Sequence, residues 1–270
     1  MQLGLGSYAY AWAIGIPGYP PPEPMKAMVF VERAAALGLH VVQIADNLPL
    51  HQMNSDEIEC LFGKTKALGI QVEIGTRGIA PDHLHRYLEL AQRFESRILR
   101  TVVDTADDHP SPEEIVAVLR PLMPEFERTG VTLAIENHDR FKARTLVSIL
   151  QEVSSPYLGI CLDTVNSFGA GEGSEGVVDV LAPYVVNLHV KDFSIRRHHH
   201  MLGFEVEGTP AGKGMLDVPW LLRELRKKKR DFNAILETWP PPEIEIMHTI
   251  QKEDLWVQES IQYLRTLIKE

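Results

Sequence analysis

The sequence predicts an α/β fold, a single (β/α)8 TIM barrel, and two observations support this prediction. Short apolar stretches typical of strands alternate with amphipathic stretches typical of helices along the whole chain. This alternation is typical of parallel strands joined by right-handed crossovers. The 270 residues accommodate eight such strand–helix units, the number that closes a barrel of this class. An open doubly wound sheet is the alternative, but no G-x-G-x-x-G pattern follows the first predicted strand.

The eight predicted strands are apolar runs spaced through the whole chain. They cover residues 3–7, 41–45, 71–75, 98–103, 132–136, 159–163, 185–189 and 234–237. No linker, low-complexity tract or shift in composition separates them. We therefore expect residues 1–270 to form one domain.

The predicted helices between these strands end in a recurring way. Gly38, Gly69 and Gly130 each stand between an amphipathic stretch and the next apolar run. Glycine is favoured there because it tolerates the left-handed conformation that closes a helix. The intervals are 69 − 38 = 31 and 130 − 69 = 61 residues, close to one and two repeats, so a junction without glycine is expected near Ser96. A Ser-x-x-Glu pattern beginning at Ser111 predicts a capped helix start.

Two segments that follow predicted strands are too long for ordinary connections. Residues 8–24 are rich in aromatic residues, Gly and Pro, and residues 192–217 are rich in cations and Gly. Loops of this length inside a compact domain are typical of lids or binding loops. Because both follow strands, we expect them on the C-terminal face of the barrel, where such enzymes bind substrate.

The composition excludes several classes of function. Lys+Arg 27 against Asp+Glu 37 gives a formal net charge of −10, which disfavours a nucleic-acid partner and attachment to anionic membranes. No run of about 18 apolar residues exists to span a membrane. Two cysteines cannot build a disulfide framework. No basic residue precedes the apolar opening, so we expect no signal peptide and a cytoplasmic location.

The last four predicted strands end alike, at residues that can bind a metal ion. These residues are Glu136, Asp163, His189 and Glu237. Since the carboxyl ends of parallel strands meet on one face of a barrel, we expect the four side chains to point into one mouth. Three carboxylates and one imidazole favour Mn²⁺, Mg²⁺ or Co²⁺ over metals that prefer thiolates. Four protein ligands on an octahedral ion leave two positions for a hydroxy-carbonyl unit of a sugar.

On these residues the chain resembles the xylose isomerase-like TIM barrels, a family of sugar isomerases, epimerases and inosose dehydratases. The resemblance covers nearly the whole length and rests on Ile135-Glu136-Asn137, Leu162-Asp163-Thr164, His189-Val190-Lys191-Asp192 and Leu236-Glu237-Thr238. It implies that the four residues above are divalent-metal ligands and that Glu136 and Glu237 also move the proton. Asn166 is a departure, because many epimerases carry His three residues after the aspartate. An amide can hydrogen-bond a hydroxyl but does not transfer a proton near neutral pH.

Cations gather after the same strands, which is unexpected in a protein of charge −10. They include Arg197, the histidines 198–200 and Lys213. Arg and Lys at the mouth would recognise a carboxylate or phosphate of the substrate, whereas a solvated loop that binds nothing is the alternative. The predicted substrate-binding residues are His138, Arg140, Asn166, Lys191, Arg196 and, for a sugar hydroxyl, Glu73.

Four further residues have two interpretations each. Tyr8, Tyr10 and Trp12 alternate in the first long segment and either stack on a sugar or pack within the loop. Cys161 lies two residues before Asp163, and we expect a buried, inert thiol there rather than a nucleophile.

These residues predict a divalent-metal-dependent enzyme of carbohydrate metabolism that acts on a small oxo-sugar through an enediolate. The first expectation is a sugar isomerase or epimerase, in which Glu136 or Glu237 removes and returns a proton beside the carbonyl. The alternative is a lyase on an oxo sugar acid, of the 3-oxo-isoapionate decarboxylase or inosose dehydratase type. The four-ligand set argues against a binding module without turnover, and the charge argues against an endonuclease for abasic DNA. Homo-oligomers are common among such barrels, but the sequence indicates no interface.

Overall fold

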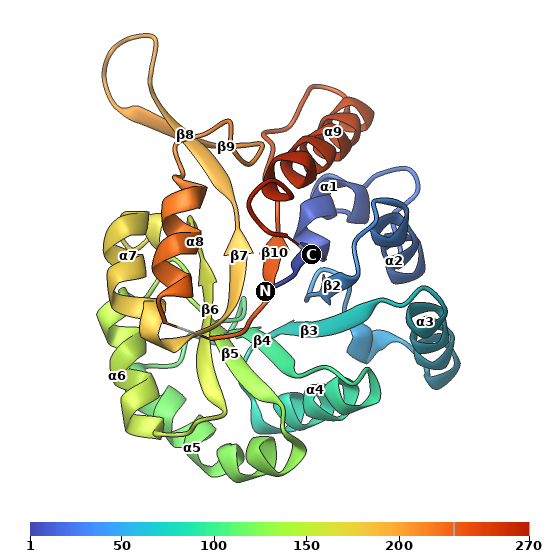
Figure 1. Ribbon diagram of the computed structural model, residues 1–270, viewed down its shortest axis with the longest axis vertical. Coiled ribbons are helices and arrows are strands. Elements are labelled where there is room, and N and C mark those ends of the chain that lie inside the picture. Colours follow the sequence, from blue (N-terminus) through green and yellow to red (C-terminus); the bar gives the residue numbers. More distant parts are fainter. Residues whose placement is uncertain (229, 270) are drawn as a thin grey trace.

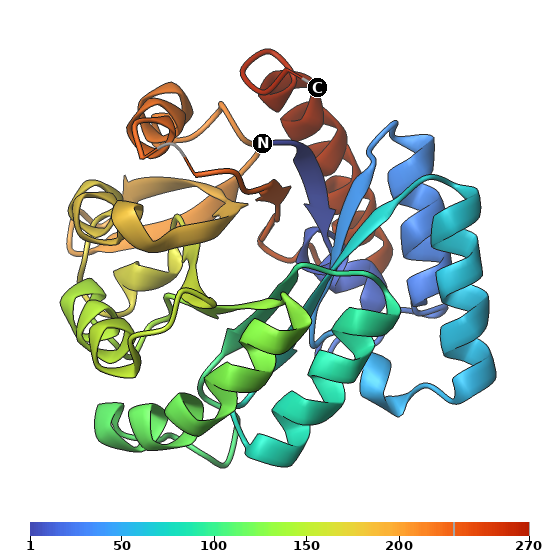
Figure 2. The same cartoon turned by 60° about the horizontal axis from the view of Figure 1, so that its bottom comes forward.

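The structure of this chain, a computed structural model, describes residues 1–228 and 230–269. It confirms the predicted fold class, because eight parallel strands close into a barrel with helices around it (Figures 1 and 2). The order around the barrel is β1-β10-β7-β6-β5-β4-β3-β2. Strand β1 pairs in parallel with both β10 and β2, which closes the ring between the first and last units.

The eight barrel strands match the eight predicted runs to within two residues at either end. They are β1 (Leu3–Gly6), β2 (Val41–Ile44), β3 (Gln71–Arg77), β4 (Ile98–Val102), β5 (Thr132–Glu136), β6 (Leu158–Asp163), β7 (Val185–Val190) and β10 (Ala234–Leu236). Most of their residues are buried on both faces, as expected of parallel strands packed between a barrel interior and a layer of helices.

A helix follows each barrel strand and covers the outside of the sheet (Figure 2). These helices are α2 (Ala27–Ala36), α3 (Ser55–Ala67), α4 (Pro81–Arg93), α5 (Pro112–Thr129), α6 (Ala143–Val153), α7 (Ser174–Leu181), α8 (Val218–Arg226) and α9 (Ile246–Leu264). The first long segment contains one short helix, α1 (Ala11–Ile14). Among the described residues, no helix is both long enough and apolar enough to cross a membrane.

The helix ends confirm the predicted junctions. Gly38, Gly69 and Gly130 have φ angles of 69°, 65° and 72°, the left-handed conformation that favours glycine. At the junction without glycine, Glu95 takes the same conformation with φ 54°. Ser111 begins α5 with the predicted capping box, because its side chain accepts from the backbone of the third helical residue and that residue's carboxylate accepts from Ser111 N.

The second long segment, predicted to be a lid or binding loop, has regular secondary structure over part of its length. It contains two antiparallel strands, β8 (Asp192–Arg197) and β9 (Phe204–Thr209), and this hairpin projects beyond the barrel (Figure 1). The residues alternate between apolar and polar along both strands, which is the pattern of a two-faced hairpin. We call residues 192–209 the arm, with a tip formed by residues 198–203.

Candidate metal centre

The four residues predicted to bind a metal converge at the C-terminal end of the barrel. Glu136 and Asp163 end β5 and β6, His189 lies one residue before the end of β7, and Glu237 directly follows β10. Asp163 and His189 are register partners on neighbouring strands. All four side chains are buried. Gly6 makes room for this packing, since a Cβ there would lie 2.8 Å from Glu237 Cγ.

His189 Nδ1 is the point on which the three carboxylates converge. It lies 3.3 Å from Glu136 Oε2, 3.5 Å from Glu237 Oε2 and 3.8 Å from Asp163 Oδ2. The side chains of Asp163, His189 and Glu237 each offer a ligand atom within 4.8 Å of the others. Burial disfavours a charged imidazole, but the acidic side chains around it raise the pKa of His189 well above its ordinary value. The carboxylates of this centre therefore attract a cation strongly.

The pattern of unpartnered atoms tests whether this centre fits a metal ion. Among the described residues, His189 Nδ1 and Glu237 Oε1 are buried without a hydrogen-bond partner, whereas Asp163 Oδ2 and Glu237 Oε2 share the Lys191 ammonium. Buried polar atoms without partners are rare and costly, so two of them at one point leave room for a further ligand. A divalent cation is the group that three carboxylates and one imidazole nitrogen bind together. The residues fit the ion predicted from the sequence.

Lys191 already places one positive charge at this centre. Its Nζ lies 2.8 Å from both Asp163 Oδ2 and Glu237 Oε2. Burial disfavours the ammonium, but the two carboxylates outweigh that effect and raise the pKa of Lys191 above its ordinary value. Burial likewise raises the pKa of Asp163, yet Lys191 and His189 hold that pKa well below its usual range. Both groups are therefore charged at neutral pH.

Glu136 differs from Glu237 because both of its oxygens accept hydrogen bonds. Asn166 Nδ2 donates to Oε1 at 2.7 Å, and the guanidinium of Arg100 donates to Oε2. Arg100 is buried and also donates to Asp46 Oδ1 at 2.9 Å and to Thr76 O at 3.1 Å. Burial alone would raise the pKa of Glu136, but the charge of Arg100 holds that pKa below its ordinary value. Glu136 is thus a fixed anion.

Arg100 was missed by the sequence analysis, although one signal could have found it. It stands in the middle of the otherwise apolar run that forms β4. A charged residue inside a buried strand is costly unless a partner neutralises it. That cost predicts an acidic partner on a neighbouring strand, and Glu136 on β5 is that partner.

Gln43 on β2 fixes the orientation of the His189 ring through a hydrogen bond to Nε2. Its Nε2 donates to Asn187 Oδ1 at 2.9 Å and to Glu73 Oε2 at 3.2 Å, so its Oε1 is left to face His189 Nε2 at 2.6 Å. An amide oxygen can only accept, and His189 must therefore donate from Nε2. Whenever the imidazole is neutral, as it must be to bind a metal ion, its lone pair then lies on Nδ1, toward the carboxylates.

Glu73 lies in this network beneath the centre rather than in the mouth, where a sugar-binding role would need it. It is buried in the barrel interior and accepts hydrogen bonds from Gln43, Asn187 and Asn233. Burial raises the pKa of Glu73, and the three amides offset only part of that effect.

Cys161 lies beside the centre, within 4.8 Å of ligand atoms of Glu136 and His189. Burial raises the pKa of its thiol to about 11, so the thiol is protonated at neutral pH. Its Sγ lies 3.3 Å from Asn187 Oδ1. This environment is that of the buried, unreactive thiol expected from the sequence.

A cavity of about 310 Å³ adjoins the centre. It is lined by Val165, Asn166, Phe168, Lys191, Val206 and Trp239. Asn166 contacts Glu136, and Lys191 contacts Asp163 and Glu237, so two lining residues connect the cavity to three of the four predicted ligands. The walls are otherwise apolar, and one of them, Val206, comes from the arm. The cavity can hold a small polar molecule with its polar end toward the centre.

The remaining predicted substrate-binding residues have partners other than the four residues of the centre. His138 contacts Asp139 at 2.6 Å. Arg140 donates to Asp104 Oδ2 at 2.9 Å and stacks on Phe141. Arg196 forms an ion pair with a glutamate of β9 on the arm. The structure therefore brings Asn166 and Lys191 to the centre and places His138, Arg140 and Arg196 in other contacts.

Tyr8, Tyr10 and Trp12 of the first long segment all donate hydrogen bonds to other parts of the chain. Tyr10 donates to Asp254 at 2.8 Å, and the Trp12 indole donates to Pro240 O at 3.0 Å, so both hold the segment against the C-terminal part of the chain. Tyr8 instead donates to Asp46, the carboxylate that also accepts from Arg100.

Comparisons with known proteins agree with this fold. The model of the xylose isomerase-like TIM barrel family matches residues 19–267. The chain is also 36% identical to the 3-oxo-isoapionate decarboxylase of Pectobacterium atrosepticum over 266 residues, which cover 98% of this chain and 96% of that enzyme.

Two solved structures illustrate the shared architecture. The D-psicose 3-epimerase of Clostridium cellulolyticum H10 with D-tagatose has a TM-score of 0.75 at 15% identity, covering 98% of this chain and 99% of that one. A xylose isomerase-like TIM barrel protein of Mycobacterium smegmatis in complex with magnesium has a TM-score of 0.68 at 14% identity, covering 96% of each chain.

Proposed function

Because this chain belongs to the xylose isomerase-like TIM barrel family, we propose that it is a divalent-metal-dependent decarboxylase that acts on a 3-oxo sugar acid. The observation that carries this proposal is the 36% identity to a 3-oxo-isoapionate decarboxylase over 98% of the chain. The cavity beside the centre supports it, since Lys191 offers a cation to a substrate carboxylate.

The proposed metal ligands are Glu136, Asp163, His189 and Glu237. Their oxygen-rich set suits Mg²⁺, Mn²⁺ or Co²⁺. When bound, such an ion supplies Lewis-acid chemistry, because it polarises a substrate carbonyl and stabilises negative charge on its oxygen. A solved structure of the same fold contains magnesium, which is consistent with this choice.

The substrate class explains how CO₂ could leave. In a 3-oxo acid the ketone carbon is two bonds from the carboxyl carbon, so the electron pair of the breaking carbon–carbon bond moves toward the ketone oxygen. The carbon that loses CO₂ must then take up one proton. Asn166 and Lys191 can hold the polar groups of the substrate, while Phe168, Val206 and Trp239 line the cavity with apolar surface.

We propose that Glu237 supplies that proton. Lys191 Nζ lies 2.8 Å from Glu237 Oε2, and no other hydrogen bond holds either oxygen of Glu237 among the described residues. Glu237 takes up a proton from solvent and delivers it to the substrate carbon, while the Lys191 ammonium, whose pKa the carboxylates raise, stays protonated and holds the substrate carboxylate. Glu136 is less suited to this task, because Arg100 and Asn166 keep it anionic.

A sugar isomerase or epimerase is the second candidate function. It is favoured by the position of Glu136 and Glu237 on two sides of His189, at 3.3 and 3.5 Å from its Nδ1. Two carboxylates facing one substrate can remove a proton from one position and return it at another. The structural similarity to D-psicose 3-epimerase is consistent with this alternative.

Carbon and proton NMR in D₂O distinguishes the two candidates. The protein is stripped with a chelator, reloaded with Mg²⁺, and offered 3-oxo sugar acids beside a panel of ketoses. We expect metal-dependent loss of the carboxyl carbon, with deuterium at the carbon that carried it. Deuterium uptake beside a ketose carbonyl with every carbon retained would instead establish the isomerase or epimerase. Turnover that persists in the chelator would contradict both.

A further inference from the structure

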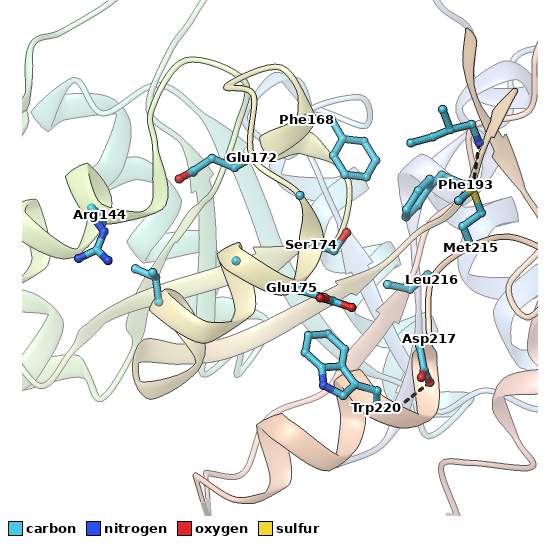
Figure 3. A pocket seen from close by; sticks show the side chains of 14 residues that line it. Arg144, Phe168, Glu172, Ser174, Glu175, Phe193, Met215, Leu216, Asp217 and Trp220 are labelled. Atoms are coloured by element: carbon cyan, nitrogen blue, oxygen red, sulfur yellow. Dashed lines mark hydrogen bonds between the residues drawn. The ribbon is translucent and has the colours of Figure 1, made fainter. Parts of the chain in front are cut away.

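Two spaces lie next to each other at the root of the arm, and one side chain lines both. The cavity that adjoins the centre has a volume of about 310 Å³, and a groove beside it has a volume of about 720 Å³. Among the described residues, Phe168 alone lines the cavity as well as the groove. Figure 3 shows the groove, with the rings of Phe168 and Phe193 close together.

The arm gives independent evidence that the two spaces are neighbours. Ile195 lines the groove and Val206 lines the cavity. These two residues are register partners on β8 and β9. Side chains directly opposite each other on paired strands share one face and lie about 5 Å apart. The groove and the cavity therefore meet along one face of the arm, and the ring of Phe168 lies between them.

The position of this ring is fixed by packing on two sides. Phe168 ends a short 3₁₀ helix that begins at Asn166. Its ring stacks edge-on against the ring of Phe193, with the centroids 4.6 Å apart. The backbone directly after it is also confined, because a Cβ on Gly169 would lie 2.3 Å from Asp139 Cβ. The ring of Phe168 is thus a wall that belongs to the fold rather than a side chain free in solvent.

The volumes on the two sides of the wall indicate what it decides. Sites that bind small molecules usually have volumes of roughly 300–1,000 Å³. The cavity lies at the small end of this range, whereas the groove is more than twice as large. A ligand that binds at the centre and fills the cavity must therefore end at Phe168. A longer ligand could reach the groove only through the place that the ring occupies.

The two spaces also differ in charge. Lys191 is the one charged residue among the described residues that line the cavity. In the groove, the carboxylates of Glu172, Glu175 and Asp217 outnumber the guanidinium of Arg144, and most of the other large lining side chains are apolar. If the wall were removed, the groove would accept an apolar extension of a ligand and would disfavour an acidic one.

We propose that Phe168 determines the size of the substrate, because its ring separates the cavity from the groove and so restricts the centre to small oxo acids that end within the cavity. This inference rests on the proposed function, since it places the reacting end of the substrate at the centre. Phe168 has no part in the chemistry and acts only by excluding a longer chain.

The binding of two hydroxamates to the Mn²⁺-loaded protein tests this proposal without turnover. A hydroxamate chelates a divalent ion through two oxygens, so acetohydroxamate reports on the centre, and octanohydroxamate adds an apolar chain. In isothermal titration calorimetry we expect Phe168→Ala to bind octanohydroxamate at least about tenfold more tightly than the wild type, because each buried methylene group adds roughly fourfold. The affinity for acetohydroxamate should not change.

Ile195→Ala is the matched control for this measurement. Ile195 is an apolar residue that lines the groove but not the cavity. Its removal enlarges the groove and leaves the wall in place, so both affinities should equal those of the wild type. Phe168→Leu, which removes less of the side chain, should give the same result as Phe168→Ala with a smaller gain.

A crystal structure of Phe168→Ala tests the wall itself and needs no metal. We expect one continuous space from the cavity to the groove. The proposal would be overturned if Phe193 filled the place of the ring, or if Phe168→Ala and the wild type bound octanohydroxamate equally while both bound acetohydroxamate. If neither protein bound acetohydroxamate, the proposed metal centre would be contradicted instead, and the crystal structure would decide whether Phe168 separates the two spaces.

Discussion

Glu136 and Glu237 are both buried beside His189, yet the structure treats them in opposite ways. Glu136 has hydrogen-bond partners on both oxygens, from Asn166 and the buried guanidinium of Arg100. Glu237 Oε1 has no hydrogen-bond partner among the described residues, and its Oε2 lies 2.8 Å from the Lys191 ammonium and 3.5 Å from His189 Nδ1. Glu136 and Glu237 are equally buried, so the difference between them comes from the side chains next to each.

This difference separates two tasks that the sequence assigned to both glutamates. A carboxylate held by a buried guanidinium is stabilised as an anion and is a poor proton carrier. A carboxylate with one oxygen free of partners can bind a ligand and exchange a proton. We therefore propose Glu136 as a permanent anion and Glu237 as the more reactive group.

The largest expected effect is the loss of turnover in Glu237→Gln. The amide keeps the size of the side chain but removes its charge and its capacity to carry a proton. We expect turnover to fall by roughly 10²–10⁴-fold with little change in melting temperature. Glu243→Gln is the control, because Glu243 is a half-exposed residue that pairs with Lys252. Full activity of Glu237→Gln would remove Glu237 from the site.

Arg100→Met tests the role of Arg100 as the partner of Glu136, and the measured quantity is the free energy of unfolding. The substitution leaves Glu136 buried without its cation, and breaking a buried pair in this way costs about 3–5 kcal/mol of unfolding free energy. Urea denaturation measures the change. Arg77→Met is the matched control, since Arg77 contacts the same Asp46 at 3.3 Å but is one-third exposed, and should cost about 1 kcal/mol or less. Equal losses in the two variants would contradict the special role of Arg100.

Gln43→Leu tests what holds His189, the residue that lies beside both glutamates. Without the Gln43 oxygen, His189 Nε2 loses its acceptor, and the imidazole is no longer held with Nδ1 free. We expect the affinity for Mn²⁺ to fall by roughly 10–100-fold, measured by isothermal titration calorimetry. Gln151→Leu on the surface should leave that affinity unchanged. An unaltered affinity in Gln43→Leu would show that Gln43 does not orient His189.

Glu253 is a buried carboxylate whose pKa is shifted by burial with no contribution from a cation. It accepts from the backbone of Trp12 and Ala13, and burial raises its pKa from 4.5 to about 8. The folded protein therefore keeps a proton that the unfolded chain loses between these values, so the free energy of unfolding should fall as pH rises through that window. Urea titrations should show a smaller fall for Glu253→Gln. Parallel pH profiles would show that Glu253 ionises normally in the folded protein.

The strands and the ligand set were predictable because their signals are local. Each barrel strand is an apolar run, and three of the preceding helices end at a glycine with positive φ. Glu136, Asp163, His189 and Glu237 follow from the strand ends, because parallel strands place those ends on one face. Once the eight strands are placed, the convergence of the four residues requires no further information.

The partners of these residues were not predictable in the same way. Arg100 meets a glutamate 36 positions away, and Gln43 meets His189 across 146 positions. Neither pair has a spacing that a sequence pattern would show. The arm was missed for a different reason: its alternation is short, and the cations and glycines around it are typical of a loop.

The sequence by itself determined the order of strands and helices and the ring of four predicted ligands, because hydrophobic periodicity and helix ends are properties of neighbouring residues. Only the tertiary structure decided which cations face that ring. Lys191 lies against two of the carboxylates, whereas Arg140 and Arg196 pair elsewhere. Charges act over a few ångströms in space, and closing the barrel sets those distances independently of separation along the chain.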